Sequence, residues 1–86
     1  MNENYYVITI LFPSSANETL IGFLSGYSNQ AGFLEEDNKL VCYIPEADYT
    51  ETLERDVITF LADIKDDFEA KEYNINIEKI QNQNWN

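Results

Sequence analysis

The apolar residues of this chain fall into strand-like runs and two stretches with helical spacing. Residues 5–12 (YYVITILF) are apolar on both alternating sets, which predicts a central strand with a neighbour on each face. Residues 31–47 (AGFLEEDNKLVCYIPEA) predict two short strands, because Asp37 and Asn38 between them tolerate the positive φ of a tight turn. Residues 73–80 (YNINIEKI) alternate isoleucine with polar residues, which predicts a half-buried edge strand.

Two amphipathic helices are predicted between these strands. The first is expected to begin at a capping box made by Ser15 and Glu18, which have the required spacing of three residues. The second is expected to begin in the same way at Asp48 and Glu51. The apolar stripes are Leu20, Phe23, Leu24 and Tyr27 in the first helix and Leu53, Val57, Phe60, Leu61, Ile64 and Phe68 in the second. Each helix therefore has one apolar side that can pack on a sheet.

The order of these elements is β-α-β-β-α-β, which predicts a ferredoxin-like α+β fold. In this arrangement two helices cover one face of a four-stranded antiparallel sheet, and the first and third strands lie in its middle. No internal linker or short repeat divides the sequence. We therefore expect one domain over residues 1–80.

One face of the predicted sheet has no helix to cover it. Because the first strand is apolar on both sides, one of its two alternating sets must point away from the helices. These sets are Tyr5, Val7, Thr9 and Leu11, or Tyr6, Ile8, Ile10 and Phe12. Such a face calls for a second subunit, another domain or a ligand as its cover. The alternative is that its apolar residues are scattered singly, which is normal for a protein surface.

The charge of the chain is one-sided, with 16 acidic residues, 5 basic residues, no histidine and a net charge of −11. A nucleic acid is a poor partner for this composition, because the lysines and arginine form no cluster that could neutralise phosphates. A basic protein is a better partner, since the negative field steers cations toward the domain. The simpler interpretation is that the charge only keeps the domain soluble.

The single cysteine, Cys42, lies in the apolar run LVCYIP and is interpreted as a small core residue. It cannot form an internal disulfide, so nothing indicates an oxidising compartment. The amino-terminal sequence lacks a basic region, and its apolar run is too short for a signal peptide or a membrane span. We therefore expect a cytoplasmic protein that does not enter a membrane.

Residue types that carry out catalysis or hold cofactors are scarce in this sequence. Without histidine, neither a Cys–His nucleophile pair nor a common zinc site can be built. The three glycines lack the spacing of a phosphate or nucleotide loop. The carboxylate pairs Glu35-Glu36 and Asp66-Asp67 are expected in contact with water, where a raised pKa suited to acid-base catalysis does not arise. We expect no catalytic, cofactor-binding or metal-binding residue in this chain.

Several motifs together give the chain a resemblance to a known family. They are YYVITILFP at the start, GF-EE and L-CYIPE in the middle, and I-NQNWN at the end. With them the chain resembles the N-terminal domain of the bacterial ribosomal protein methyltransferases that modify large-subunit protein L-eleven. The resemblance extends over essentially the whole chain, and the Asn-Trp ending is its most distinctive part.

This resemblance implies a substrate-recognition domain that binds and orients a basic ribosomal protein. A separate catalytic domain of the parent protein would bind S-adenosylmethionine and transfer the methyl groups, so this chain alone would not be an enzyme. Residues 81–86 would begin the linker to that domain, with Trp85 in its first turn. We expect the partner to contact the open sheet face and the acidic hairpin at Glu35, Glu36 and Asp37. The alternative is a free-standing ferredoxin-like module that dimerises through the open face and binds a regulatory ligand.

Overall fold

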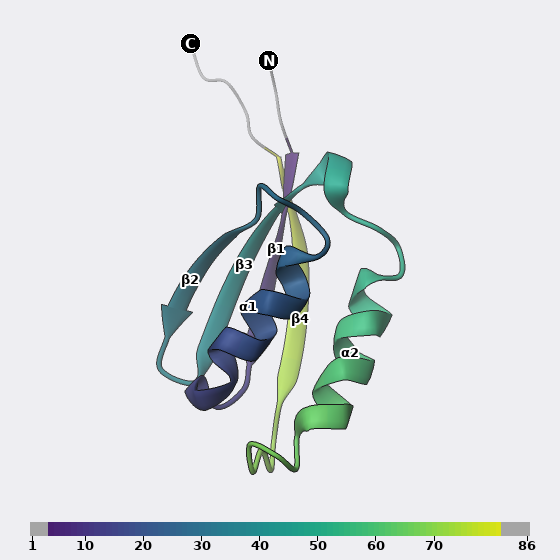
Figure 1. Ribbon diagram of the computed structural model, residues 1–86. Helices are drawn as coiled ribbons and strands as arrows, with labels where there is room; N and C mark the ends of the chain where they lie inside the picture. The colour runs from purple at the N-terminus through teal and green to yellow at the C-terminus, as the bar shows by residue number, and fades with distance from the viewer. Residues whose placement is uncertain (1–3, 82–86) are drawn as a thin grey trace.

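Four antiparallel strands form one sheet in the order β2-β3-β1-β4. The structure is a computed structural model that describes residues 4–81. Its elements, drawn in Figure 1, are β1 (Asn4–Leu11), α1 (Asn17–Ser25), β2 (Gly32–Glu36), β3 (Lys39–Pro45), α2 (Leu53–Ile64) and β4 (Asn74–Gln81), with short 3-10 helices η1 (Ser14–Ala16) and η2 (Glu46–Asp48). The predicted strands are therefore confirmed, with the ends of β1 and β4 shifted by one residue.

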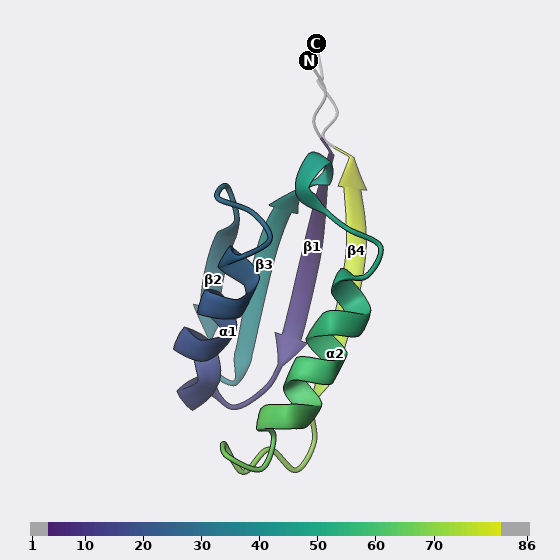
Figure 2. The ribbon, with the colours of Figure 1, turned by 45° about the vertical axis from the view of Figure 1, so that its right-hand side comes forward.

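Both helices cover the same face of this sheet, as Figure 2 shows. β1 and β3 lie in the middle, and β2 and β4 form the two edges. Each strand is antiparallel to its neighbours. The two strands joined by a helix are never neighbours, because β3 lies between β1 and β2, and β1 lies between β3 and β4. The predicted ferredoxin-like α+β fold is confirmed.

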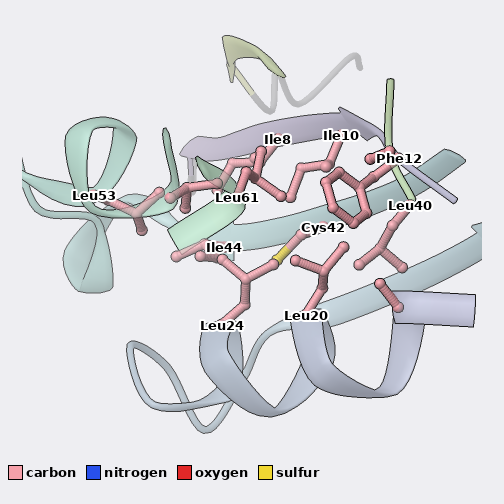
Figure 3. Close-up of a cluster of buried hydrophobic side chains, with 13 residues drawn as sticks. Ile8, Ile10, Phe12, Leu20, Leu24, Leu40, Cys42, Ile44, Leu53 and Leu61 are labelled. Atoms are coloured by element: carbon pink, nitrogen blue, oxygen red, sulfur yellow. The ribbon is translucent and has the colours of Figure 1, made fainter. Parts of the chain in front are cut away.

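The core fills the space between the sheet and the two helices (Figure 3). Directly opposed residues of antiparallel strands share a face, so Ile8 of β1 lies between Cys42 of β3 and Ile77 of β4. The helices contribute fully buried leucine and valine side chains, which are Leu20 and Leu24 from α1 and Leu53, Val57 and Leu61 from α2. Burial of each such side chain stabilises the fold by roughly 1.5–3 kcal/mol. The prediction that Cys42 is a core residue is confirmed, because its side chain is fully buried.

The two predicted capping boxes are wrong. Each helix is preceded by a 3-10 turn, and neither helix has a hydrogen bond from a capping side chain. Ser15 lies inside η1, so it cannot occupy the capping position of α1, which begins at Asn17. Asp48 ends η2, and its Oδ2 accepts a 2.6 Å hydrogen bond from the Ser28 hydroxyl. The Asp48 carboxylate thus links the connection before α2 to the connection after α1. The helix α2 itself begins later, at Leu53.

The predicted turn at residues 37–38 is confirmed and is anchored to the end of β1. Asn38 has a φ of 55°, in the left-handed region that asparagine tolerates better than most residues. Its backbone N–H donates to Ser14 Oγ at 2.6 Å, and its side-chain Oδ1 accepts from the Ser14 N–H at 3.2 Å. These reciprocal bonds fix the hairpin of β2 and β3 against the connection that leaves β1.

The turns that follow α2 end in a Schellman motif. The Ala70 N–H donates to the Lys65 carbonyl at 2.8 Å, and the Glu69 N–H donates to the Asp66 carbonyl at 3.3 Å. Glu69 occupies the left-handed position of this motif with a φ of 54°. Glycine is the usual residue at that position, because a Cβ atom there strains the backbone.

This geometry predicts that Glu69→Gly stabilises the protein. The Glu69 side chain is exposed, so the variant removes backbone strain without removing core packing. We expect the free energy of unfolding to rise by about 0.5–1 kcal/mol in urea denaturation, after the greater flexibility of glycine in the unfolded chain is included. Glu69→Ala is the control, because it removes the charge and keeps the Cβ atom. A glycine variant no more stable than the alanine variant would contradict the interpretation.

Candidate functional site

The sheet face opposite the helices is the candidate site, and we call it the open face. The set of β1 residues that points there is Tyr5, Val7, Thr9 and Leu11, because Ile8 and Ile10 are buried under the helices. The register then adds Lys39, Val41, Tyr43 and Pro45 from β3, Gly32, Leu34 and Glu36 from β2, and Asn74, Asn76, Glu78 and Ile80 from β4. Between them they form four short rows across the sheet.

The large apolar side chains that remain exposed within residues 4–81 are concentrated on the open face. The exposed fractions there are 44% for Leu11, 48% for Leu34, 40% for Tyr43 and 46% for Ile80. The remaining large exposed apolar residue of this part of the chain is Ile58 on α2, at 45%. Four of these five residues lie on one face, so they form a patch and are not scattered singly over the surface.

Most apolar residues of the open face form a continuous band that crosses all four strands, and Leu11 and Pro45 lie on either side of it. We call it the apolar band; its members are Tyr5, Val7, Leu34, Val41, Tyr43 and Ile80. In the register Ile80 lies opposite Tyr5, Val7 opposite Tyr43, and Val41 opposite Leu34. Each of these pairs is one row further along the sheet than the pair before it. The band therefore runs diagonally from the β4 edge to the β2 edge.

Polar residues border the apolar band along one side. Glu78 lies opposite Val7 and two residues before Ile80 on β4, at one end of the band. Glu36 lies two residues after Leu34 on β2, at the other end. The positions between them hold Thr9, Asn74 and Asn76, together with Lys39 and the apolar Leu11. The open face thus combines an apolar centre with a largely polar border that includes two carboxylates, and an apolar centre with a polar rim is the distribution found at protein interfaces.

Lys39, the lysine on the open face, forms an ion pair with an acidic neighbour. Lys39 Nζ lies 4.0 Å from Glu36 Oε2, and the two side chains are 41% and 46% exposed to water. A pair of this kind contributes little to stability, because water and salt screen it. Glu36 therefore remains able to exchange this partner for a cation of another molecule.

The three predicted partner-binding residues do not share one surface. Glu36 points to the open face, where it opposes Lys39. Glu35 is its neighbour on a strand and so points to the opposite side, where its Oε1 accepts a 3.1 Å hydrogen bond from Asn17 Nδ2. Asp37 lies in the turn. Trp85, the predicted linker residue, lies outside the described residues.

A concave surface separate from the open face lies between α1 and α2. It has a volume of about 290 Å³ and is lined by Phe23, Tyr27, Arg55, Asp56, Thr59, Phe60 and Asp63. Phe23 and Phe60 stack on each other with ring centroids 4.2 Å apart. The Tyr27 hydroxyl donates to Asp56 Oδ2 at 2.8 Å, and burial together with this bond raises the pKa of Tyr27 to about 12. These groups bind the two helices to each other, so the surface is explained by packing.

Groups suited to covalent or metal chemistry are limited in the described part of the chain. Burial raises the pKa of the Cys42 thiol to about 12, which keeps it protonated at neutral pH. Residues 4–81 contain no cluster of three or more histidine, cysteine, aspartate or glutamate side chains that could hold a metal ion. Over the same range, no helix is long and apolar enough to cross a membrane.

Comparison with protein-family models, with curated proteins and with solved structures found no match for this chain. The geometry of the open face and the motifs of the sequence are therefore the grounds for a functional proposal.

The state of Cys42 predicts that its thiol reacts only after the domain unfolds. At pH 8, a thiol reagent such as dithionitrobenzoate should modify the native protein at least about 10³-fold more slowly than the urea-unfolded chain, given an unfolding free energy of about 5 kcal/mol or more. Because Cys42 is the single cysteine of the sequence, the reaction reports on this site alone. Native and unfolded rates within tenfold of each other would show that the thiol is accessible.

The raised pKa of Tyr27 predicts a loss of stability in alkaline solution. Its folded-state pKa of about 12 exceeds the ordinary value of 10.0, so its contribution is fully present below pH 10 and is lost as the pH rises toward 12. Tyr27→Phe has no proton to lose. The decline of the unfolding free energy between pH 10 and 12 should therefore be shallower in this variant, and equal slopes would refute the assignment.

Proposed function

We propose that this chain is a protein-recognition module that binds a basic protein through its open face. The observation that carries the proposal is the concentration of exposed apolar side chains on that face beside Glu36 and Glu78. Burial of the apolar centre supplies binding free energy, while the two carboxylates of the border select a positively charged partner. The net charge of −11 acts in the same direction by steering cations toward the domain.

The charge distribution also favours a protein over a nucleic acid as the partner. Two of the five basic residues are paired with carboxylates, since Lys39 lies beside Glu36 and Lys79 Nζ lies 2.7 Å from Glu46 Oε2. A module that stacks RNA bases on a sheet of this topology needs cations for the phosphates. On the open face of residues 4–81 the one cationic side chain is Lys39.

More specifically, we propose that the module is the substrate-recognition domain of an S-adenosylmethionine-dependent ribosomal protein methyltransferase. The support for this step is the sequence resemblance. Three of its four motifs fall on β1, on β2 and on β3 with its continuation into η2, and the fourth begins at Ile80 on β4 and continues outside the described residues. The strands β1, β2 and β3 supply most of the open face. In this proposal the chain binds and orients the basic ribosomal protein, and a catalytic domain elsewhere in the parent protein carries the cofactor and the chemistry.

Dimerisation through the open face is the competing proposal. An apolar band with no cover suits a second copy as well as a different protein. A dimer would, however, bring together two domains that each carry a net charge of −11. This repulsion favours a basic partner over a second copy, and salt should promote the dimer while it weakens the complex with a basic protein.

The proposed function predicts weak, salt-dependent binding to the ribosomal protein. Titration of large-subunit protein L-eleven into the fluorescently labelled domain should give a dissociation constant that rises steeply between 50 and about 300 mM salt. The affinity should be modest, because a single face of so small a domain buries less than roughly 1,200 Å², which is the class of transient complexes. Glu35→Gln, Glu36→Gln and Asp37→Asn together should weaken binding about tenfold. No binding at any salt concentration would remove the proposal for the isolated chain.

The structure provides a control of equal charge for this experiment. Glu54→Gln, Asp63→Asn and Asp66→Asn together remove three negative charges from exposed positions at α2 and just after it. Their effect on binding should be smaller than that of the hairpin triple variant. Of the single hairpin changes, Glu36→Gln should matter most, since Glu36 is the one of the three that points to the open face. Equal effects of the two triple variants would mean that net charge alone governs the association.

A further inference from the structure

The partner element that covers the open face can be described more closely, if the proposed function holds. We propose that it is an amphipathic helix of about four turns, with lysine or arginine residues along one flank. It would lie diagonally across the sheet with its apolar stripe on the apolar band. The domain would then become a three-layer assembly with helices on both faces of its sheet.

The hydrogen bonding of the sheet determines which kind of element can lie on this face. β1 is paired with β3 and β4, and β3 is paired with β1 and β2, so both central strands bond on either side. The face itself therefore offers side chains and no free backbone groups. A loop or single strand placed on it would lose water from its own N–H and C=O groups without finding partners. A helix avoids this cost, because its backbone bonds are internal.

The apolar band has the dimensions of a short helix. It spans three strand intervals and two rows, from Ile80 on β4 to Leu34 on β2. With strands about 4.8 Å apart and same-face residues about 6.8 Å apart, the two ends are separated by roughly 20 Å. A helix rises 1.5 Å per residue, so about 13 residues cover this length. Apolar residues at positions i, i+4, i+7 and i+11 of such a helix would follow the band.

The position of the acidic residues specifies the polar side of the helix. Glu78 and Glu36 lie next to the two ends of the band, and both are on the same side of it. Between them lie Thr9, Asn74 and Asn76, which can form hydrogen bonds with long polar side chains, together with Leu11 and with Lys39, the partner of Glu36. The cations of the partner helix should therefore follow one flank, and they should be concentrated near its ends.

A second copy of this chain would offer another sheet whose backbone is already paired. It satisfies the hydrogen-bonding requirement as well as a helix does. Two facing copies would, however, add a second Glu36 and a second Glu78 to the same interface without new cations beyond another Lys39. Like charges at an interface cost binding free energy, so the charge pattern favours the basic helix.

The test uses a blocked 14-residue peptide with leucine at positions i, i+4, i+7 and i+11, lysine along one flank and alanine elsewhere. Backbone amide shifts of the labelled domain should change on β1, β3 and the open-face positions of the edge strands, with little change on α1 and α2. The control peptide has the same composition in scrambled order, so it carries the same charge without an apolar stripe. We expect it to bind at least tenfold more weakly.

Matched variants of the domain locate the binding surface. Leu34→Ser with Ile80→Ser removes the two ends of the apolar band and should weaken peptide binding at least tenfold. Ile58→Ser is the control, because Ile58 is similarly exposed but lies on α2. Leu34→Ser alone, on an edge strand, serves if the double variant is unstable. Glu36→Gln with Glu78→Gln should weaken binding more than Glu54→Gln with Asp63→Asn, which removes the same charge from α2.

The outcomes separate this inference from the proposed function. One outcome is that the ribosomal protein binds while the peptide does not, and that Leu34→Ser with Ile80→Ser leaves the binding of the ribosomal protein unchanged. This result would refute the proposed partner helix and leave the recognition function standing. If the ribosomal protein and the peptide both fail to bind, both proposals fall. If the domain alone sediments as a dimer that Leu34→Ser disrupts, a second copy occupies the face and the helix proposal is wrong.

Discussion

The position of β1 in the middle of the sheet is the constraint on which the rest of the structure depends. Its side chains are largely apolar on both faces, yet the two helices cover only one of them. On the covered face, Ile8 and Ile10 are fully buried and form the centre of the core. On the other face, the same strand leaves Val7 and Leu11 partly or largely open to water. β1 thus contributes both to the core and to the exposed apolar surface, and the other three strands add Leu34, Tyr43 and Ile80 to that surface.

Features that depend on a residue's own side chain and its immediate spacing could be predicted from the sequence. The strand runs, the helix stripes and the turn at residues 37–38 are of this kind, because alternation and backbone preference act locally. The starts of the helices could not, since Asp48 is engaged by Ser28, a residue 20 positions away. The left-handed conformation of Glu69 also gave no signal, because glutamate is not a residue that favours it.

The existence of an open sheet face could be predicted from the sequence, but the residues that lie on it could not. The two alternating sets of β1 are both largely apolar, with Thr9 as the polar exception, and the burial of Ile8 and Ile10 shows which set the helices cover. Glu35 and Glu36 were expected to act together, although consecutive residues of a strand point to opposite sides. Leu34, Glu78 and Ile80 were missed, because their contribution appears only when β2 and β4 are aligned with the central strands.

An exposed apolar band and a large net charge have opposite effects on self-association, and here they occur together. The apolar band favours contact with any surface that can bury it, including another copy of the chain. The charge of −11 opposes contact between copies but favours contact with a cationic surface. Since Glu36 and Glu78 stand directly beside the band, this discrimination acts at the surface where contact would occur. Charge thus makes a general apolar surface selective for basic partners.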